Sequence, residues 1–138
     1  MKYLVDANIL SEVTKAAPHQ RVIEWLRAHE AQLVVNPVIL GEVEYGILQL
    51  VAGKKRRDLE EWFARISRRI PVVDIDAETG RIWAALLARL KRAGRAMPLK
   101  DSLIAASAVR HAMTVATRNT ADFRHSGARV INPFSWGA

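Results

Sequence analysis

The chain has 138 residues, with 21 lysines and arginines against 14 aspartates and glutamates, and no cysteine. This length suits one domain over residues 1–138, and the lack of cysteine excludes disulfides, thiolate metal sites and a cysteine nucleophile. No signal-peptide pattern follows Met1 and no apolar run is long enough to cross a membrane, so we expect a cytoplasmic protein. The formal charge of +7 favours a polyanionic partner such as nucleic acid, with solubility alone as the alternative explanation.

Strand and helix patterns alternate from the start of the chain. An apolar run at residues 3–5 predicts a first, central strand that ends at Asp6. Residues 8–13 begin a helix, and a second helix with a period near 3.6 follows at residues 22–29. Residues 33–35 predict the second strand.

The middle of the chain continues this alternation. Asn36 and Pro37 are typical of a helix start, and residues 54–66 form an amphipathic segment that opens with four basic residues. The apolar residues at 71–75 predict a third strand, and residues 76–94 predict a long helix with a capping aspartate at its start and a glycine at its end.

The last third contains a helix that is almost wholly apolar or small, at residues 102–111, between predicted strands. The fourth and fifth strands are expected at residues 114–117 and 129–131. Strands that alternate with helices indicate a parallel sheet covered on both faces. We therefore predict an α/β fold, a three-layer α/β/α sandwich with a central parallel sheet of about five strands.

Four carboxylates stand where a predicted strand passes into a helix, or on the helix that follows: Asp6, Glu42, Asp101 and Asp122. The carboxyl ends of parallel strands face one crevice, so residues far apart in sequence meet there. Four acids in one crevice repel each other strongly unless a hard divalent cation shares their charge. The pattern therefore predicts metal-dependent phosphate chemistry.

Most of these acids also have a structural explanation. Asp6 and Asp101 are each placed to cap the helix that follows, and the spacing of Asn119 and Asp122 allows a capping box. Because Asn8 supplies a second capping side chain at the first helix start, a functional role for Asp6 is favoured over capping alone. For Asp101 the two explanations are evenly balanced.

Other site chemistries lack their sequence patterns. The four histidines have no zinc-ligand spacing, no serine lies in a Gly-x-Ser-x-Gly elbow, and no Gly-x-x-x-x-Gly-Lys loop is present. Basic residues gather at 54–57, 65–69 and 91–95, where they are suited either to contact phosphates or to form a solvated face.

Four segments form an ordered set of motifs: residues 4–12 (LVDANILSE), 42–46 (EVEYG), 101–106 (DSLIAA) and 115–123 (VATRNTADF). Each motif is weak by itself, but the four in this order and at these separations are specific. Together they resemble the PIN-domain family, in particular its VapC-type toxin ribonucleases and the similar FitB. The resemblance covers essentially the whole chain.

The resemblance implies a set of site residues. The acidic quartet is Asp6, Glu42, Asp101 and Asp122, and the polar residues around it are Asn8, Thr117 and Asn119. The resemblance also chooses Glu42 over Glu44, a choice that helical periodicity leaves open. Two positions depart from the family pattern, because Asn36 stands where serine or threonine is usual and Glu44 where a basic residue is usual.

The resemblance further implies a Mg²⁺- or Mn²⁺-dependent endoribonuclease, the toxin of a type II toxin–antitoxin pair. Its partners would be an RNA substrate, a second copy in a homodimer, and a VapB-like antitoxin that also carries the complex to operator DNA. We expect Asp6 and Asp101 to be the principal metal ligands, with Glu42 and Asp122 holding water molecules or a second ion. Oxygen ligands without histidine or cysteine suit Mg²⁺, which lowers the pKa of water and neutralises charge at phosphorus.

Two other functions remain open from the sequence. A phosphoacceptor receiver domain is also a small α/β protein with an acidic Mg²⁺ pocket, but it needs paired acids after the first strand and a lysine after the last. The other alternative is a FitB-like component of a DNA-bound regulatory complex, whose nuclease activity is secondary to binding a small DNA-binding partner.

Overall fold

The computed structural model describes residues 1–137 and contains a four-stranded parallel sheet in the order β2-β1-β3-β4. The strands are β1 (Tyr3–Val5), β2 (Leu33–Val34), β3 (Thr114–Ala116) and β4 (Arg129–Ile131). β1 pairs with β2 on one side and with β3 on the other. The predicted α/β fold with a parallel sheet and a central first strand is therefore confirmed.

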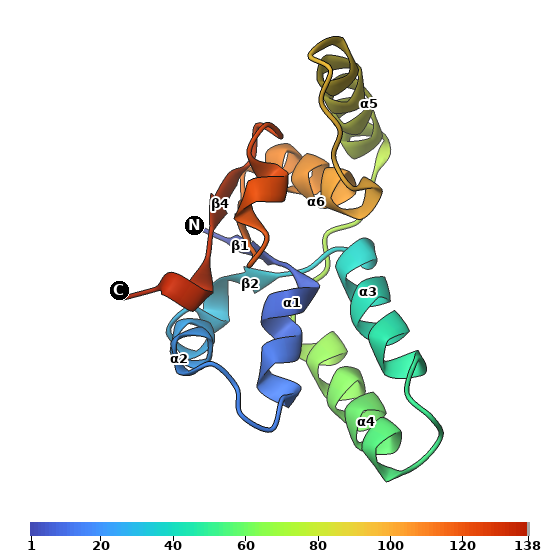
Figure 1. Cartoon of the computed structure of the whole chain (residues 1–138), viewed down its shortest axis with the longest axis vertical. Coiled ribbons are helices and arrows are strands. Elements are labelled where there is room, and N and C mark those ends of the chain that lie inside the picture. Colours follow the sequence, from blue (N-terminus) through green and yellow to red (C-terminus); the bar gives the residue numbers. More distant parts are fainter. Residues whose placement is uncertain (138) are drawn as a thin grey trace.

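Six α-helices surround this sheet: α1 (Ala7–Leu10), α2 (Gln20–Ala28), α3 (Pro37–Leu48), α4 (Lys54–Arg69), α5 (Ala77–Arg92) and α6 (Leu99–Arg110). In Figure 1 the helices α5 and α6 lie toward the top of the view and α1 to α4 toward the bottom, with the strands between them. None of the helices in residues 1–137 combines the length and the apolar character needed to cross a membrane.

The predicted third strand at residues 71–75 is wrong in extent. Only Val72 pairs with the sheet, through a single parallel bridge to Val35. The Val35 N–H donates to the Pro71 carbonyl oxygen at 3.0 Å, and the Val73 N–H donates to the Val35 oxygen at 2.9 Å. Pro71 has no N–H to extend the ladder, and Val72 remains 42% exposed at the sheet edge, so little stabilises a longer strand. The sheet therefore has four strands and one bridge instead of five strands.

The two central strands carry the core. In β1 and β3 the side chains of Leu4, Val5, Val115 and Ala116 are completely buried. Strands covered on both faces have apolar residues at successive positions instead of alternating ones, which explains the short apolar runs in the sequence. The ends of these two strands are consequently the most firmly fixed positions in the sheet.

The cap of α3 is a second fixed point, because it links α3 to α6. Asn36 is fully buried, and its side-chain oxygen accepts a hydrogen bond from the Ile39 N–H at 2.9 Å. Its amide nitrogen donates to Ser107 Oγ on α6 at 3.0 Å. Pro37 occupies the first helical turn, as the sequence predicts.

We expect Asn36→Ala to lower the free energy of unfolding by about 2 kcal/mol, because it removes a cap and leaves the Ser107 hydroxyl without its partner. Asn36→Ser retains the capping oxygen and should lose about half as much. Urea denaturation of both variants measures the effect, with Gln49→Ala at the exposed end of α3 as the control. A loss for Asn36→Ala no greater than for Gln49→Ala would contradict this role.

Candidate active site

The carboxyl ends of β1 and β3 meet at Asp6 and Thr117. The Asp6 N–H donates to the Ala116 carbonyl oxygen at 2.9 Å, which extends the ladder by one residue. Thr117 Oγ1 then donates to Asp6 Oδ2 at 2.7 Å. Both residues are almost completely buried, with Asp6 3% and Thr117 0% exposed. The chain adds β2 on one side of β1 and β3 on the other, so the strand order changes direction beside β1. Open α/β sheets bind ligands at such a switch point.

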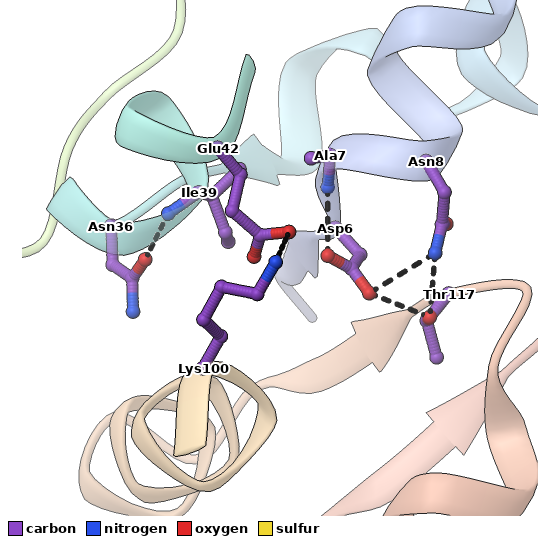
Figure 2. A network of polar contacts seen from close by, with 8 residues as sticks. All are labelled: Asp6, Ala7, Asn8, Asn36, Ile39, Glu42, Lys100 and Thr117. Carbon is purple, nitrogen blue, oxygen red and sulfur yellow. Dashed lines mark hydrogen bonds and ion pairs between the residues drawn. The ribbon is translucent and has the colours of Figure 1, made fainter. Parts of the chain in front are cut away.

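Asn8 completes a polar network around Asp6, as shown in Figure 2. Its side-chain nitrogen donates to Asp6 Oδ2 at 3.3 Å and to Thr117 Oγ1 at 3.4 Å, while its oxygen accepts from the Arg118 N–H at 3.1 Å. Asn119 joins through its backbone, because its N–H donates to Thr117 Oγ1 at 3.0 Å. The three polar residues that the sequence places around the acids thus lie together at one strand end.

Asp6 both caps a helix and faces this network. Asp6 occupies the capping position of α1, and its Oδ1 accepts from the Ala7 N–H, the first in the helix, at 2.8 Å. Together with the bonds from Thr117 and Asn8, the carboxylate accepts three hydrogen bonds. A carboxylate has about four lone-pair positions, so it retains room for one further ligand.

Asp101 lies in the first turn of α6 and does not cap it. The helix begins at Leu99, three residues before the predicted start, and Pro98 occupies the capping position. The capping explanation of Asp101 is therefore wrong. The side chain is 8% exposed, and burial together with the charges of Asp6, Asp122 and Glu42 raises the pKa of Asp101 to about 6. Asp6, Asp122 and Glu42 therefore all lie within electrostatic reach of Asp101.

Asp122 sits on a short 3₁₀ turn, Thr120–Phe123, and is exposed. The capping box that the spacing of Asn119 and Asp122 allows is absent, because the Asn119 N–H that would complete it donates to Thr117 Oγ1 instead. Only a backbone bond joins the two residues, from the Asp122 N–H to the Asn119 oxygen at 3.1 Å. The Asp122 carboxylate is thus left out of the local capping pattern.

Glu42 projects from α3, one residue before the buried Val43, and is half-buried, whereas Glu44 is exposed. Its Oε2 lies 3.2 Å from the Nζ of Lys100 on α6, the contact drawn in Figure 2. Its Oε1 is buried and has no hydrogen-bond partner among residues 1–137. An unpartnered buried carboxylate oxygen is costly, so this atom is suited to an additional cation or a proton donor.

The chemistry of these side chains fits a hard divalent cation. The donors are carboxylate oxygens, which Mg²⁺ and Mn²⁺ prefer, and both the spare lone pair of Asp6 and the free Glu42 Oε1 could accept an ion. Within residues 1–137, however, no three acids or histidines lie close enough together to form a ready metal site.

Lys100 contributes to this region, a role that the sequence interpretation does not assign to it. Lys100 pairs with Glu42, and the signal available in the sequence is a lysine directly before Asp101 at a helix start.

Glu12 is a buried acid, 3% exposed, with two partners. Its Oε2 accepts a hydrogen bond from the His19 N–H at 2.8 Å, and its Oε1 lies 2.9 Å from Lys15 Nζ. Burial acts to raise the pKa of Glu12, but these two partners outweigh it and hold the pKa below its ordinary value. Glu12 therefore anchors the segment between α1 and α2.

Asp101 should make the stability of the metal-free protein depend on pH. Its folded-state pKa of about 6 lies above the ordinary 3.8, so between these values the folded chain binds a proton that the unfolded chain lacks. The stability contributed by this group therefore increases as pH falls from 7 toward 4.

Asp101→Asn removes this effect and should be more stable than the wild type by about 1–2 kcal/mol above pH 7, after allowance for solvent screening. The difference should shrink as pH falls through 6 and vanish near 4. Urea denaturation in EDTA at several pH values measures it, with Asp58→Asn on the exposed face of α4 as the control. A difference between Asp101→Asn and wild type that stays constant with pH would show that Asp101 titrates normally.

The fold and this strand-end cluster define a small parallel α/β domain with coupled acids at the switch point of its sheet. Residues 3–127 match the family described as the PIN domain, and the chain belongs to the PIN-domain family. This membership removes the receiver-domain alternative.

Several proteins of the family are similar to this chain over almost its whole length. The chain is 33% identical over 137 residues to VapC ribonuclease Y4jK of Sinorhizobium fredii, across 95% of this chain and 96% of the relative. It is 30% identical over 138 residues to toxin FitB of Neisseria gonorrhoeae, across 95% and 97% of the two chains. The solved structure of FitAB bound to a DNA fragment superposes with a TM-score of 0.87 at 30% identity, across 96% of this chain and 95% of the other.

Proposed function

We propose that this protein is a metal-dependent endoribonuclease that acts as the toxin of a type II toxin–antitoxin pair. The observation that carries the proposal is the coupled acidic cluster at the carboxyl ends of β1 and β3, in a chain that belongs to the PIN-domain family and resembles a VapC ribonuclease and toxin FitB over its whole length. The substrate class is RNA, and the reaction is hydrolysis of a phosphodiester bond.

Each acid has a role in this proposal. Asp6 and Asp101 would hold a Mg²⁺ or Mn²⁺ ion, and the chemistry that such an ion would supply is a lower pKa of the attacking water and neutralisation of the negative charge at phosphorus. Thr117 and Asn8 keep the Asp6 carboxylate in one orientation through their hydrogen bonds to Oδ2. Glu42 and Asp122 would orient water molecules or hold a second ion, and one of them would accept the proton that the attacking water loses.

The net charge of +7 supports RNA as the substrate. The acidic cluster by itself repels a polyanion, and the excess of basic residues over the whole chain offsets this repulsion. Cations are concentrated on α4, which carries Lys54, Lys55, Arg56, Arg57, Arg65, Arg68 and Arg69. A basic surface attracts the phosphates, and the divalent ion lets one of them approach the acids.

We also propose a VapB-like antitoxin as partner, through which the complex reaches operator DNA. The superposition on FitAB bound to DNA supports both, since that structure contains a toxin-like chain with a partner and DNA.

We also propose the homodimer that the family resemblance implies. Tyr45 and Leu48 are exposed apolar side chains on α3 that a second chain could cover. Size-exclusion chromatography of the isolated chain tests this part, and a monomer at micromolar concentration contradicts it.

The alternative function is a FitB-like regulatory component whose main duty is to form the DNA-bound complex. The same superposition favours it. A cleavage assay on the isolated chain separates the two functions, because only the nuclease proposal requires the chain to cut RNA without a partner.

Removal of single acids should abolish cleavage without unfolding the chain. We expect Asp101→Asn and Glu42→Gln to reduce RNA cleavage by at least about a hundredfold, since each removes a charge that the ion or the water needs. In the wild type Mn²⁺ should raise the melting temperature by mass action, and it should do so much less in Asp101→Asn.

The matched control for these variants is Glu44→Gln, which lies on the same helix as Glu42 but is exposed. It should cleave RNA and respond to Mn²⁺ as the wild type does. Cleavage by Asp101→Asn at the wild-type rate, with Mn²⁺ in excess, would end the metal-nuclease proposal.

A second prediction concerns the antitoxin. The cluster already accepts the Lys100 ammonium at Glu42, so we expect the antitoxin to place a basic side chain, an arginine, against the same acids. Substituting that arginine by glutamine should weaken inhibition of cleavage by about tenfold or more, measured by titrating antitoxin into the assay. Inhibition that is unchanged by this substitution, in a complex that still forms, would contradict it.

A further inference from the structure

Lys100 makes an ion pair that its own helix does not explain. It stands in the first turn of α6, where the positive end of the helix dipole disfavours a cation. Of the six ion pairs among residues 1–137, four join residues three or four positions apart, whereas Lys100 reaches across 58 residues to Glu42 on α3. The lysine therefore spans the two helices that present two of the four acids.

The two oxygens of Glu42 are in different situations. Oε2 is held by the Lys100 ammonium at 3.2 Å, whereas Oε1 is buried without a partner among the described residues. Lys100 occupies one lone pair of Oε2, whereas Oε1 has no hydrogen bond and is the freer of the two oxygens for an ion. Figure 2 shows the lysine approaching Glu42 from α6, on the side away from Asn8 and Thr117.

Stability alone does not account for this pair. The Lys100 side chain is 63% exposed, and ion pairs with an exposed partner contribute little to folding. Its charge, however, lies within the acidic cluster, where it counteracts the mutual repulsion of the acids and acts against any added cation. The effect of Lys100 should therefore appear in ion binding more than in folding.

We propose that Lys100 is a positioning residue of the acidic cluster: it holds Glu42 by Oε2, leaves Oε1 free to bind an ion, and provides the positive charge of the site until a divalent ion binds. The ammonium and the ion compete electrostatically for the same carboxylate. Lys100 thereby weakens ion binding in exchange for an ordered Glu42 in the metal-free protein. This inference rests on the proposed metal-dependent function.

The experiment is a Mn²⁺ titration of the purified chain without RNA. Electron paramagnetic resonance measures the concentration of unbound Mn²⁺ at each step. Lys100→Met should bind Mn²⁺ about five- to tenfold more tightly than the wild type, since a positive charge next to the ion is removed and solvent screens part of the effect. Lys100→Arg retains the charge and should bind Mn²⁺ as the wild type does. Both variants should melt within a few degrees of the wild type, because the lysine is largely exposed.

Two further variants make the test specific. Lys54→Met removes an equally charged lysine that pairs with Asp58 at 2.7 Å on α4, so it matches the change in net charge and should leave Mn²⁺ affinity within twofold of the wild type. In a Glu42→Gln background, Lys100→Met should change the affinity by less than half as much on a logarithmic scale, because the two residues act through one contact.

The outcomes separate this inference from the function on which it rests. A wild type that binds Mn²⁺ while Lys100→Met binds equally or more weakly overturns the role of Lys100 and leaves the nuclease proposal intact. An equal gain in Lys54→Met reduces the effect to net charge and also overturns it. A wild type that binds no Mn²⁺ at all overturns both.

Discussion

The hydrogen bonds at the carboxyl ends of β1 and β3 fix the position of Asp6, and the rest of the acidic cluster depends on this position. Asp6 is tied through its backbone to Ala116 and through its side chain to Thr117, 111 residues away in the sequence. Because both strands are buried on both faces, this junction cannot relax without disturbing the core. The remaining acids are placed relative to this point by α3, α6 and the turn after β3.

The electrostatics of Asp101 show which effects dominate in the cluster. Its place in the first turn of α6 favours the charged form, because the helix dipole stabilises an anion there. Lys100 next to it acts in the same direction, yet the pKa of Asp101 is raised to about 6. Burial and three neighbouring acids therefore outweigh the effect of the lysine on the pKa of Asp101. A cation close to these acids stabilises their charged forms.

The sequence was sufficient for those parts of the site that depend on local signals. The apolar run before Asp6, the cap at Asn36 and Pro37, and the strand before Thr117 all predict their elements correctly, because each signal lies within a few residues. The third strand was overestimated, since Val72 is apolar but lies at an exposed edge beside a proline. The pairing of Lys100 with Glu42 was missed because no periodicity relates residues 58 positions apart.

The site consists of a fixed half and an adjustable half. Asp6, Asn8 and Thr117 are joined by hydrogen bonds at the strand ends, whereas Glu42 and Lys100 meet through longer side chains and Asp122 is exposed. No three acids form a ready metal site within residues 1–137, although Asp6, Glu42 and Asp122 all interact electrostatically with Asp101. In the proposed function, an ion held at Asp6 would recruit Glu42 and Asp122 by rotation of their side chains. In the proposed mechanism the fixed half sets where the ion sits, and the adjustable half sets how readily it binds and leaves.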